Sequence, residues 1–356
     1  MKDYFKYFDK FTFALLLLLA LAGIFLVYSA GHSTGDGNYL KQAVWLAVSL
    51  LAFFAVFALK VDFVFRKAFA MLLVLLVILA LQVAVGGTVA GTKSWFRLWG
   101  IGFQFSEFIK VPLALFLARV LTQFEIVDAK AFVKILAVIL APVALIVIQP
   151  DMGVSFILCG FIPLVFLLKK VRPALLVIAV LLVFLGGFIG WHSLLKPYQK
   201  DRIVSFMNPS EYKDSTGYHI IQSKIAIGSG GLAGKGYLRG SQSRYQFLPA
   251  RHTDFIVSVV GEEMGFLGTS ILFFIFFFIF YRQFRFNFQN DEEFYFVYLF
   301  NGLVLFQFLV NVSMAIGFFP VLGISLPFVS YGGSSLLSFF IGEAIIFRIK
   351  INSFLA

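Results

Sequence analysis

The chain has 356 residues, 60% of them hydrophobic, and its mean hydropathy is +0.94. Charged residues make up 13%, against the roughly 25% that is usual in soluble proteins. This composition excludes a soluble globular enzyme and indicates an integral membrane protein. The net charge of +11 is not accompanied by a Lys/Arg-rich arm with interleaved aromatic residues, so nucleic acid is excluded as a partner.

Ten apolar runs, each about long enough to cross a bilayer as a helix, follow one another along the chain. The first is predicted to be a retained helix rather than a signal peptide, because no small-residue cleavage pattern follows it. We therefore expect an all-α polytopic membrane protein, a single membrane domain over 1–356, with a large loop at about 192–254 between the seventh and eighth helices. The expected spans cover residues 11–29, 42–59, 68–86, 106–122, 134–149, 152–168, 173–191, 255–281, 295–316 and 333–347.

Lysine and arginine residues are divided unevenly between the two sides of this topology. Sixteen belong to the side with both termini, whereas the short loops of the other side carry only Lys41, Lys93 and Arg97. The positive-inside rule then places both termini in the cytoplasm and the loop 192–254 outside. The densest polar segments also fall on this outer face, where no ATP is available, so the sequence predicts extracytoplasmic chemistry.

The glycine-rich stretch GSGGLAGKG (228–236) is a weak candidate for phosphate binding. It fails as a P-loop because Gly236 follows Lys235 where serine or threonine is required, and no strand precedes it as a dinucleotide fold would need. Two interpretations stay open, a backbone bend whose amides approach a phosphate and a plain surface turn.

Several ionisable residues lie within or beside the expected spans, where such groups are costly and usually paired or functional. Glu107 and Lys110 are three residues apart, so they share a helix face and should form an ion pair, either structural or functional. Asp151 follows a proline at a turn and suits the N-cap of the next helix. Glu262 and Glu263 are consecutive, so we expect at least one to face a polar cavity or the Glu107–Lys110 region.

Asp254 stands where the long loop meets the eighth span. A carboxylate at this water–lipid boundary, after a loop rich in arginine and lysine, suits a base that takes a proton from a sugar hydroxyl while cations hold a phosphate leaving group. The sequence has no HExxH, CxxC or paired-histidine spacing, so a metal cage built from protein ligands is not expected.

Six motifs, in order over nearly the whole chain, resemble the SEDS family of shape, elongation, division and sporulation proteins (RodA, FtsW and SpoVE types). The resemblance implies a peptidoglycan glycosyltransferase that polymerises lipid II, a disaccharide-peptide on undecaprenyl diphosphate, at the outer face of the bacterial cytoplasmic membrane. It also implies a class B penicillin-binding protein as partner. Because the motif sequences are most similar to those of the RodA type, it further implies other membrane proteins of the elongation complex as partners. The motifs are FQFSEFIK (103–110), IQPDMGVS (148–155), KDRIVSFMNP (200–209), GYHIIQSKIAIGSGGLAGKG (217–236), FLPARHTDFIVSVVGEEMGFLG (247–268) and GISLPFVSYGGSSLL (323–337).

The resemblance also assigns roles to residues. It implies that Asp254 is the catalytic base of a single inverting displacement and that Glu107 and Lys110 are a required pair. Phe105 stands where the family usually has proline, so we expect a changed helix entry rather than lost function. A divalent cation, Mg²⁺ or Mn²⁺, is expected to be held largely by the substrate diphosphate, with Asp254 as its possible protein contact. Further residues expected around the substrate cavity are Asp151, Arg202, Gln222, Ser223, Lys235, Arg244, His252, Glu262, Glu263, Ser330, Gly332, Gly333 and Ser334.

Two other functions remain open at this point, a lipid II flippase and a non-catalytic scaffold of the wall-synthesis complex. A flippase should carry polar groups through the full membrane depth, whereas the polar residues here gather toward the outer side. A scaffold predicts that the substitution Asp254→Ala is silent.

Overall fold

The computed structural model is a bundle of helices, and it describes residues 6–85, 95–98, 101–209, 211–212 and 216–355. Lys2, Lys93 and residue 86 of the third expected span lie outside these residues. The helices are α2 (Lys10–Gly31), α3 (Asn38–Phe57), α4 (Val61–Val85), α5 (Phe105–Phe108), α6 (Lys110–Leu121), α7 (Ala129–Ile148), α8 (Met152–Cys159), α9 (Phe161–Leu168), α10 (Pro173–Ile189), the π-helical turn η1 (Gly190–Leu194), α11 (Pro197–Met207), α12 (Thr216–Ser229), α13 (Ser241–Arg244), α14 (Ile256–Gln283), α15 (Asp291–Ala315) and α16 (Gly333–Leu355).

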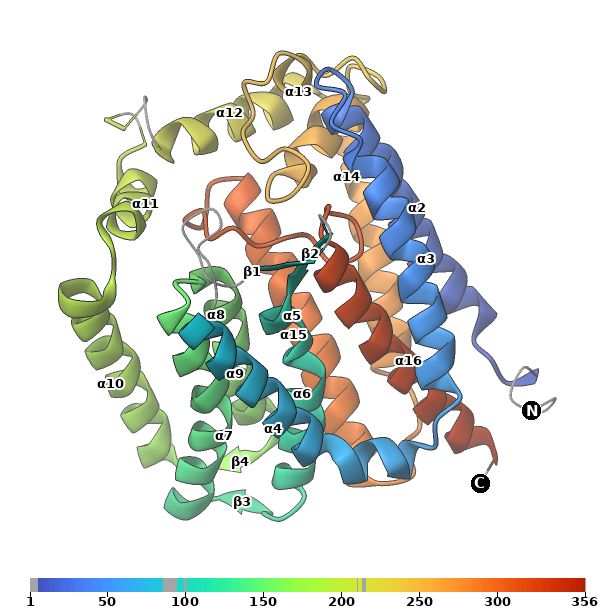
Figure 1. The fold of residues 1–356 in the computed structure, drawn as a ribbon, viewed down its shortest axis with the longest axis vertical. Coiled ribbons are helices and arrows are strands. Elements are labelled where there is room, and N and C mark those ends of the chain that lie inside the picture. Colours follow the sequence, from blue (N-terminus) through green and yellow to red (C-terminus); the bar gives the residue numbers. More distant parts are fainter. Residues whose placement is uncertain (1–5, 86–94, 99–100, 210, 213–215, 356) are drawn as a thin grey trace.

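Both ends of the chain lie at one end of the bundle, and the segment with α11, α12 and α13 arches over the other end (Figure 1). Each of the ten expected spans contains helix. Of the helices in the described residues, seven are long and apolar enough to cross a membrane, namely α2, α3, α4, α7, α10, α14 and α15. The chain is therefore a multi-span membrane protein, and the count of ten crossings stays a prediction.

Several helices begin a few residues before their expected bounds, among them α7 at Ala129 rather than 134. Two helices extend furthest beyond what we expected. The third begins at Val61 rather than at 68, because Val61, Val64 and Phe65 bury one face of its first turns although charged residues alternate with them. The last runs to Leu355 rather than to 347, because Ile349 and Ile351 are buried on either side of a lysine. Charged side chains on the outward face lower the mean hydropathy at the ends of these helices, so hydropathy alone placed the bounds too far inward.

The all-α expectation also missed two small sheets. Strand β1 (Trp95–Leu98) pairs antiparallel with β2 (Ile101–Gln104), with Trp95 opposite Gln104. Strand β3 (Ile126–Val127) pairs in parallel with β4 (Lys170–Val171). The first hairpin leads directly into α5, so it positions the start of the fourth expected span.

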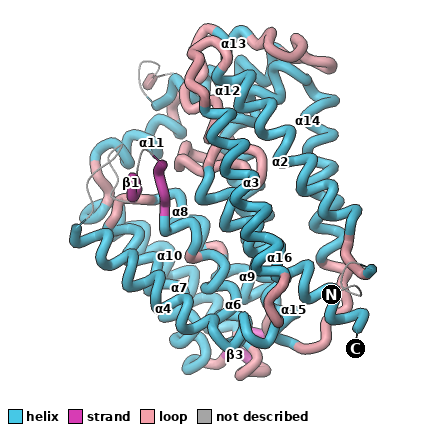
Figure 2. The backbone as a smooth tube through the Cα atoms, turned by 45° about the vertical axis from the view of Figure 1, so that its right-hand side comes forward, coloured by secondary structure: helices cyan, strands magenta, loops and turns pink. Residues whose placement is uncertain are grey.

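Helix α15 lies at the centre of the bundle and α10 at its left edge in Figure 1. Figure 2 shows the same bundle turned about the vertical axis, with helix as its main secondary structure. In the most apolar window of each helix, 67% of the residues of α15 are buried, against 6% for α10. Helix α16 packs along α3, and α6 packs along α15. Polar side chains on α6, α15 and α16 are therefore enclosed by protein rather than by lipid.

Asp9 ties together three helices at the end of the bundle that carries both termini. Its carboxylate accepts a hydrogen bond from the Thr12 amide at 3.1 Å and so caps α2. Arg282 at the end of α14 donates to the same carboxylate at 3.0 Å, and Lys350 of α16 is also bound to it. Burial raises the pKa of Asp9, but the hydrogen bonds from Lys350, Thr12 and Arg282 outweigh it and lower the pKa to about 2.

The substitution Asp9→Asn should separate the charge of this residue from its capping role, because asparagine still caps a helix. We expect a loss of about 2 kcal/mol at pH 7, measured as a lower Tm of the purified protein in detergent. Because the pKa is lower in the folded chain, this stabilisation is complete above the ordinary pKa of aspartate and is lost as the pH falls toward 2. Asp62→Asn, at an exposed acid on α4, is the control, and an unchanged Tm for Asp9→Asn at pH 7 would contradict the prediction.

Candidate functional site

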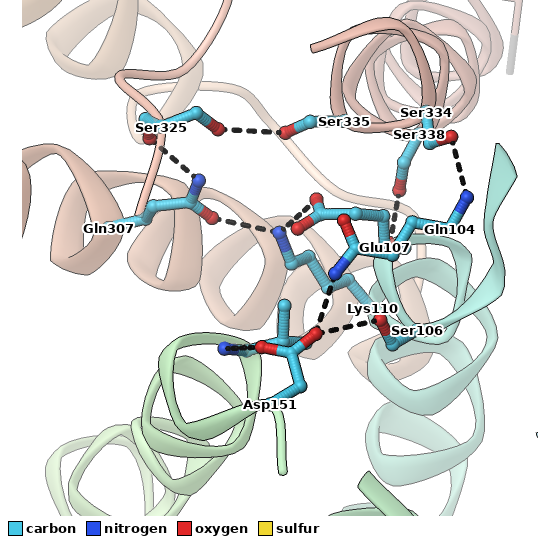
Figure 3. A network of polar contacts seen from close by, with 11 residues as sticks. Gln104, Ser106, Glu107, Lys110, Asp151, Gln307, Ser325, Ser334, Ser335 and Ser338 are labelled. Atoms are coloured by element: carbon cyan, nitrogen blue, oxygen red, sulfur yellow. Dashed lines mark hydrogen bonds and ion pairs between the residues drawn. The ribbon is translucent and has the colours of Figure 1, made fainter. Parts of the chain in front are cut away.

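The predicted ion pair forms inside the bundle (Figure 3). Lys110 Nζ donates to Glu107 Oε2 at 2.7 Å, and the lysine side chain is only 1% exposed. The same ammonium donates to Gln307 Oε1 at 2.9 Å and lies 5.0 Å from the ring centre of Phe339. The pairing is thus confirmed, and its charge is desolvated, hydrogen-bonded and held by residues of α15 and α16.

Asp151 joins this buried centre while capping a helix. Its Oδ1 accepts from the Val154 amide at 3.2 Å, which confirms the predicted N-cap of α8. Its Oδ2 accepts from Gln104 Nε2 at 2.6 Å, and the backbone amide of Gln104 donates to Ser334 Oγ at 2.9 Å. Asp151 therefore joins the end of β2 to the start of α8, and Gln104 joins both to the start of α16.

Asp254 lies in the turn that directly precedes α14. Burial raises its pKa to about 6, although a hydrogen bond from Thr253 and the positive charge of Arg202 act in the opposite direction. Arg202 comes from α11 and also donates to the Val321 carbonyl at 3.4 Å. A Cβ atom at Gly323 would lie 3.7 Å from Asp254 Oδ2, so the glycine leaves this side of the carboxylate uncovered.

A non-helical connecting segment, residues 316–332, lies between two polar centres, the Glu107–Lys110 pair and the turn that carries Asp254. Gln307 and Asn311 lie one turn apart on α15, and each donates its amide to a carbonyl of this segment, Gln307 to Ser325 at 2.9 Å and Asn311 to Ile324 at 2.6 Å. Gln307 also accepts from Lys110, and Asn311 also donates to the Asp254 carbonyl at 2.9 Å. Two neighbouring amides thus hold the ion pair, the segment and the Asp254 turn in fixed relation.

The motif SYGGSS (330–335) secures the other end of the connecting segment. Ser330 Oγ donates to the Thr253 carbonyl at 2.5 Å, and the Gly332 amide donates to Gln42 Oε1 at 3.3 Å. Gly333 lies against the indole ring of Trp45 in α3, so a Cβ atom at this position would not fit. The described contacts of this motif favour close packing of the last helix.

The glycine-rich stretch 228–236 docks on a break in α14. Gly265 has φ +66°, which interrupts the helix and exposes carbonyls and amides of the flanking turns. The amides of Lys235 and Gly236 donate to the carbonyls of Glu262 and Glu263 at 3.0 and 2.9 Å. In return the Phe266 amide donates to the Gly231 carbonyl at 2.9 Å. These amides are engaged by α14, so the structure explains the motif without a phosphate.

The two glutamates of the eighth span fasten the outer loop. Glu262 Oε1 accepts from Lys235 Nζ at 2.7 Å and from Ser241 Oγ at 3.0 Å. Glu263 Oε1 accepts from Ser29 Oγ of α2 at 2.5 Å. Both side chains are buried, and their described contacts are with the loop and α2. Of the two surroundings that we expected, a polar cavity or the Glu107–Lys110 region, these contacts do not include the second. Lys235 is accordingly neutralised by Glu262.

The remaining candidates differ in their surroundings. Ser223 is buried and bridges α12 to α14 and α15 through Ser258 Oγ at 2.6 Å and a backbone carbonyl. Gln222 is half-buried beside it, and Arg244 is exposed at the end of α13. His252 lies 5.8 Å from the ring of Tyr331, and burial lowers the pKa of its imidazole.

The sequence analysis missed Gln307 and Asn311. Gln307 contacts the ion pair through Lys110, and Asn311 contacts the Asp254 carbonyl. Their signal was present, since two amides four residues apart in an apolar run share one helix face. Gln104 and Gln42 gave no such signal, because each has its partners far away in the sequence.

The fold and the two centres define a class: a multi-span membrane protein with a buried ion pair and a half-buried acid at the entrance to a helix. The matching family model, a cell cycle protein family named for FtsW, RodA and SpoVE, covers residues 9–354. The chain belongs to this family, which confirms the resemblance seen in the six motifs.

Curated relatives match over nearly their whole length. The peptidoglycan glycosyltransferase MrdB of Escherichia coli K12 is 36% identical, with 95% of this chain and 92% of the relative covered. The peptidoglycan glycosyltransferase RodA of Treponema pallidum is 31% identical, with 96% and 97% covered. The stage V sporulation protein E of Bacillus subtilis is 32% identical, with 92% and 93% covered.

Solved structures are similar as well. One chain belongs to a peptidoglycan synthase complex that coordinates polymerization and crosslinking; it has a TM-score of 0.81 and 28% identity, with 98% of this chain and 99% of that chain covered. The rod shape determining protein RodA of Thermus thermophilus has a TM-score of 0.71 and 26% identity, with 96% of each chain covered.

Removing one member of the buried ion pair should destabilise the chain strongly. Glu107→Ala leaves the Lys110 ammonium buried without its counter-ion, and we expect a cost of about 3–5 kcal/mol, seen as a lower Tm in detergent. The double variant Glu107→Gln/Lys110→Met removes both charges at similar volume and should recover most of that loss. Glu125→Ala, at an exposed acid, serves as the control. Equal Tm values for Glu107→Ala and wild type would show that Lys110 does not depend on its partner.

Proposed function

We propose that this chain polymerises lipid II into β-1,4-linked glycan strands with Asp254 as the general base. Its curated relatives MrdB and RodA are named peptidoglycan glycosyltransferases and match almost all of the chain, so it is an enzyme of the same kind. The observation that carries the assignment to Asp254 is its setting: a half-buried carboxyl before α14, uncovered beside Gly323, with the Arg202 charge nearby.

In the proposed reaction the Asp254 carboxylate accepts the proton of the acceptor's GlcNAc 4-hydroxyl. The oxygen attacks the anomeric carbon of the donor MurNAc, and the bond to undecaprenyl diphosphate breaks as the glycosidic bond forms. The donor linkage is α and the product β, so one inverting displacement needs only one base. A pKa of about 6 suits this role, because the group is mostly ionised at neutral pH and yet more basic than an ordinary aspartate.

The leaving diphosphate requires positive charge. Arg202 is the candidate that the geometry favours, because its charge acts on Asp254, whereas Lys235 is paired with Glu262 and Arg244 is exposed on α13. In the described part of the chain no three His, Cys, Asp or Glu side chains are grouped closely enough to hold a metal ion. A Mg²⁺ or Mn²⁺ ion would therefore take most of its ligands from the diphosphate and at most one, Asp254, from this centre; when bound, it neutralises the leaving group.

The proposal places the protein in the bacterial cytoplasmic membrane, with both termini inside and Asp254 on the outer side. The uneven distribution of lysine and arginine supports this orientation. A class B penicillin-binding protein is the proposed partner within the elongation complex. The similarity to a chain from a peptidoglycan synthase complex supports a partner of this kind.

The direct test is lipid II polymerisation by the purified chain, with and without the partner, in Mg²⁺ and in chelator, with transpeptidation blocked. Asp254→Asn should lower the rate by at least about 10²-fold, because general base catalysis is lost. Its Tm should be equal or higher, because burial already disfavours the ionised carboxylate. Glu211→Gln, at an exposed acid of the same loop, should remain active.

Each outcome of this test has a distinct meaning. If Asp254→Asn polymerises as fast as wild type, the assignment of the base is wrong. If wild type also makes no glycan with its partner present, the flippase and scaffold hypotheses take precedence, and a lipid-scrambling assay separates them.

The polymerisation rate should depend on pH through the same group. Because the base must be ionised, the initial rate should rise with pH and level off above about pH 7. At pH 5 it should be about tenfold below the plateau, since the Asp254 pKa is about 6. A rate that is constant between pH 5 and 8 would exclude a base with this pKa.

A further inference from the structure

A concave site lies at the end of the molecule that carries both termini. It is an open pocket of about 350 Å³ between the ends of α14 and α16. Its walls combine three cations with aromatic rings, namely Arg282, Arg285, Lys350, Tyr281, Phe286 and Phe354. None of these residues takes part in the proposed reaction.

The pocket carries excess positive charge. Arg282 and Lys350 share the single carboxylate of Asp9, which lies behind them and is not part of the pocket wall. Arg285 instead donates to the neutral Tyr281 hydroxyl at 2.6 Å and lies 4.9 Å from that ring centre. Among the residues that the structure describes here, the three cations of the wall and the one carboxylate of Asp9 leave a formal charge of +2 (3 minus 1), which attracts an anion.

The cations are also held in place before any ligand binds. Asp9 fixes Arg282 and Lys350, Tyr281 fixes Arg285, and Lys350 Nζ lies 4.3 Å from the ring centre of Phe286. Ordering these long side chains therefore costs little at the moment of binding. Arginine and lysine together suit a phosphate group, which offers several acceptor oxygens.

An apolar ridge leads from the pocket along α14. Phe274, Phe277 and Tyr281 follow one another at helical spacing and are 63%, 64% and 45% exposed. In a helix that crosses a membrane this ridge faces acyl chains. A phosphate site at the end of such a ridge matches a phospholipid better than free phosphate or a nucleotide, because only a phospholipid fills both parts.

We propose that the pocket binds the phosphate headgroup of an anionic phospholipid, with an acyl chain lying along Phe274, Phe277 and Tyr281. The lipid belongs to the leaflet next to both termini. It bridges the ends of α14 and α16, so it strengthens the contact that Asp9 already makes between them. The proposal depends on the chain spanning a membrane and not on its glycosyltransferase activity.

The test is native mass spectrometry of the full purified chain with phosphatidylglycerol or phosphatidylcholine. Wild type should retain phosphatidylglycerol in preference to phosphatidylcholine. Arg285→Gln should weaken the retention of phosphatidylglycerol about fivefold, the effect expected for one charge near a lipid surface. Arg66→Gln removes an exposed arginine at the same end outside the pocket and should change nothing. Arg285 is not paired with Asp9, and an unchanged Tm would show that the variant is folded.

Three results would overturn the proposal. Equal retention of the two lipids would show that the anion is not recognised. Equal weakening by Arg285→Gln and Arg66→Gln would show general surface charge rather than a site. Full displacement of phosphatidylglycerol by millimolar inorganic phosphate would show a site for a free anion without a role for the acyl ridge.

Discussion

The arrangement of the polar centres depends on the two side-chain amides of Gln307 and Asn311. A backbone segment without helical hydrogen bonds is tolerated inside a membrane bundle only where protein groups satisfy its carbonyls. These amides do so for Ser325 and Ile324, and with their remaining contacts they reach Lys110 and the Asp254 carbonyl. The position of the proposed base is therefore set from α15, a largely buried helix at the centre of the bundle.

This arrangement is costly, and the cost points to function. A buried ion pair such as Glu107–Lys110 loses most of its Coulomb energy to desolvation, and apolar residues of similar size would often be equally stable. Here the pair is one member of a chain of polar contacts that extends through Gln307 to the connecting segment. Stability alone does not require such a chain, whereas precise placement of the proposed base does.

The sequence predicted features whose partners are close in the chain. Hydropathy located the helices, the i,i+3 spacing predicted the Glu107–Lys110 pair, and the turn at Asp151 predicted its cap. Contacts between distant segments were not predicted, because neither residue indicates its partner. The Lys235–Glu262 pair joins residues 27 positions apart, and the docking of the glycine-rich stretch depends on a helix break that only the φ of Gly265 reveals.

Asp9 and Asp254 show how one residue type serves two purposes in this chain. Both lie near the start of a long helix, and burial acts on both in the same direction. Asp9 has two cations and a helix amide as direct partners, so its pKa falls to about 2 and it stays ionised at neutral pH. Asp254 has a threonine hydrogen bond and the more distant charge of Arg202, so burial prevails and its pKa rises to about 6. A fully paired carboxylate holds helices together, whereas an incompletely paired one retains the basicity that proton transfer requires.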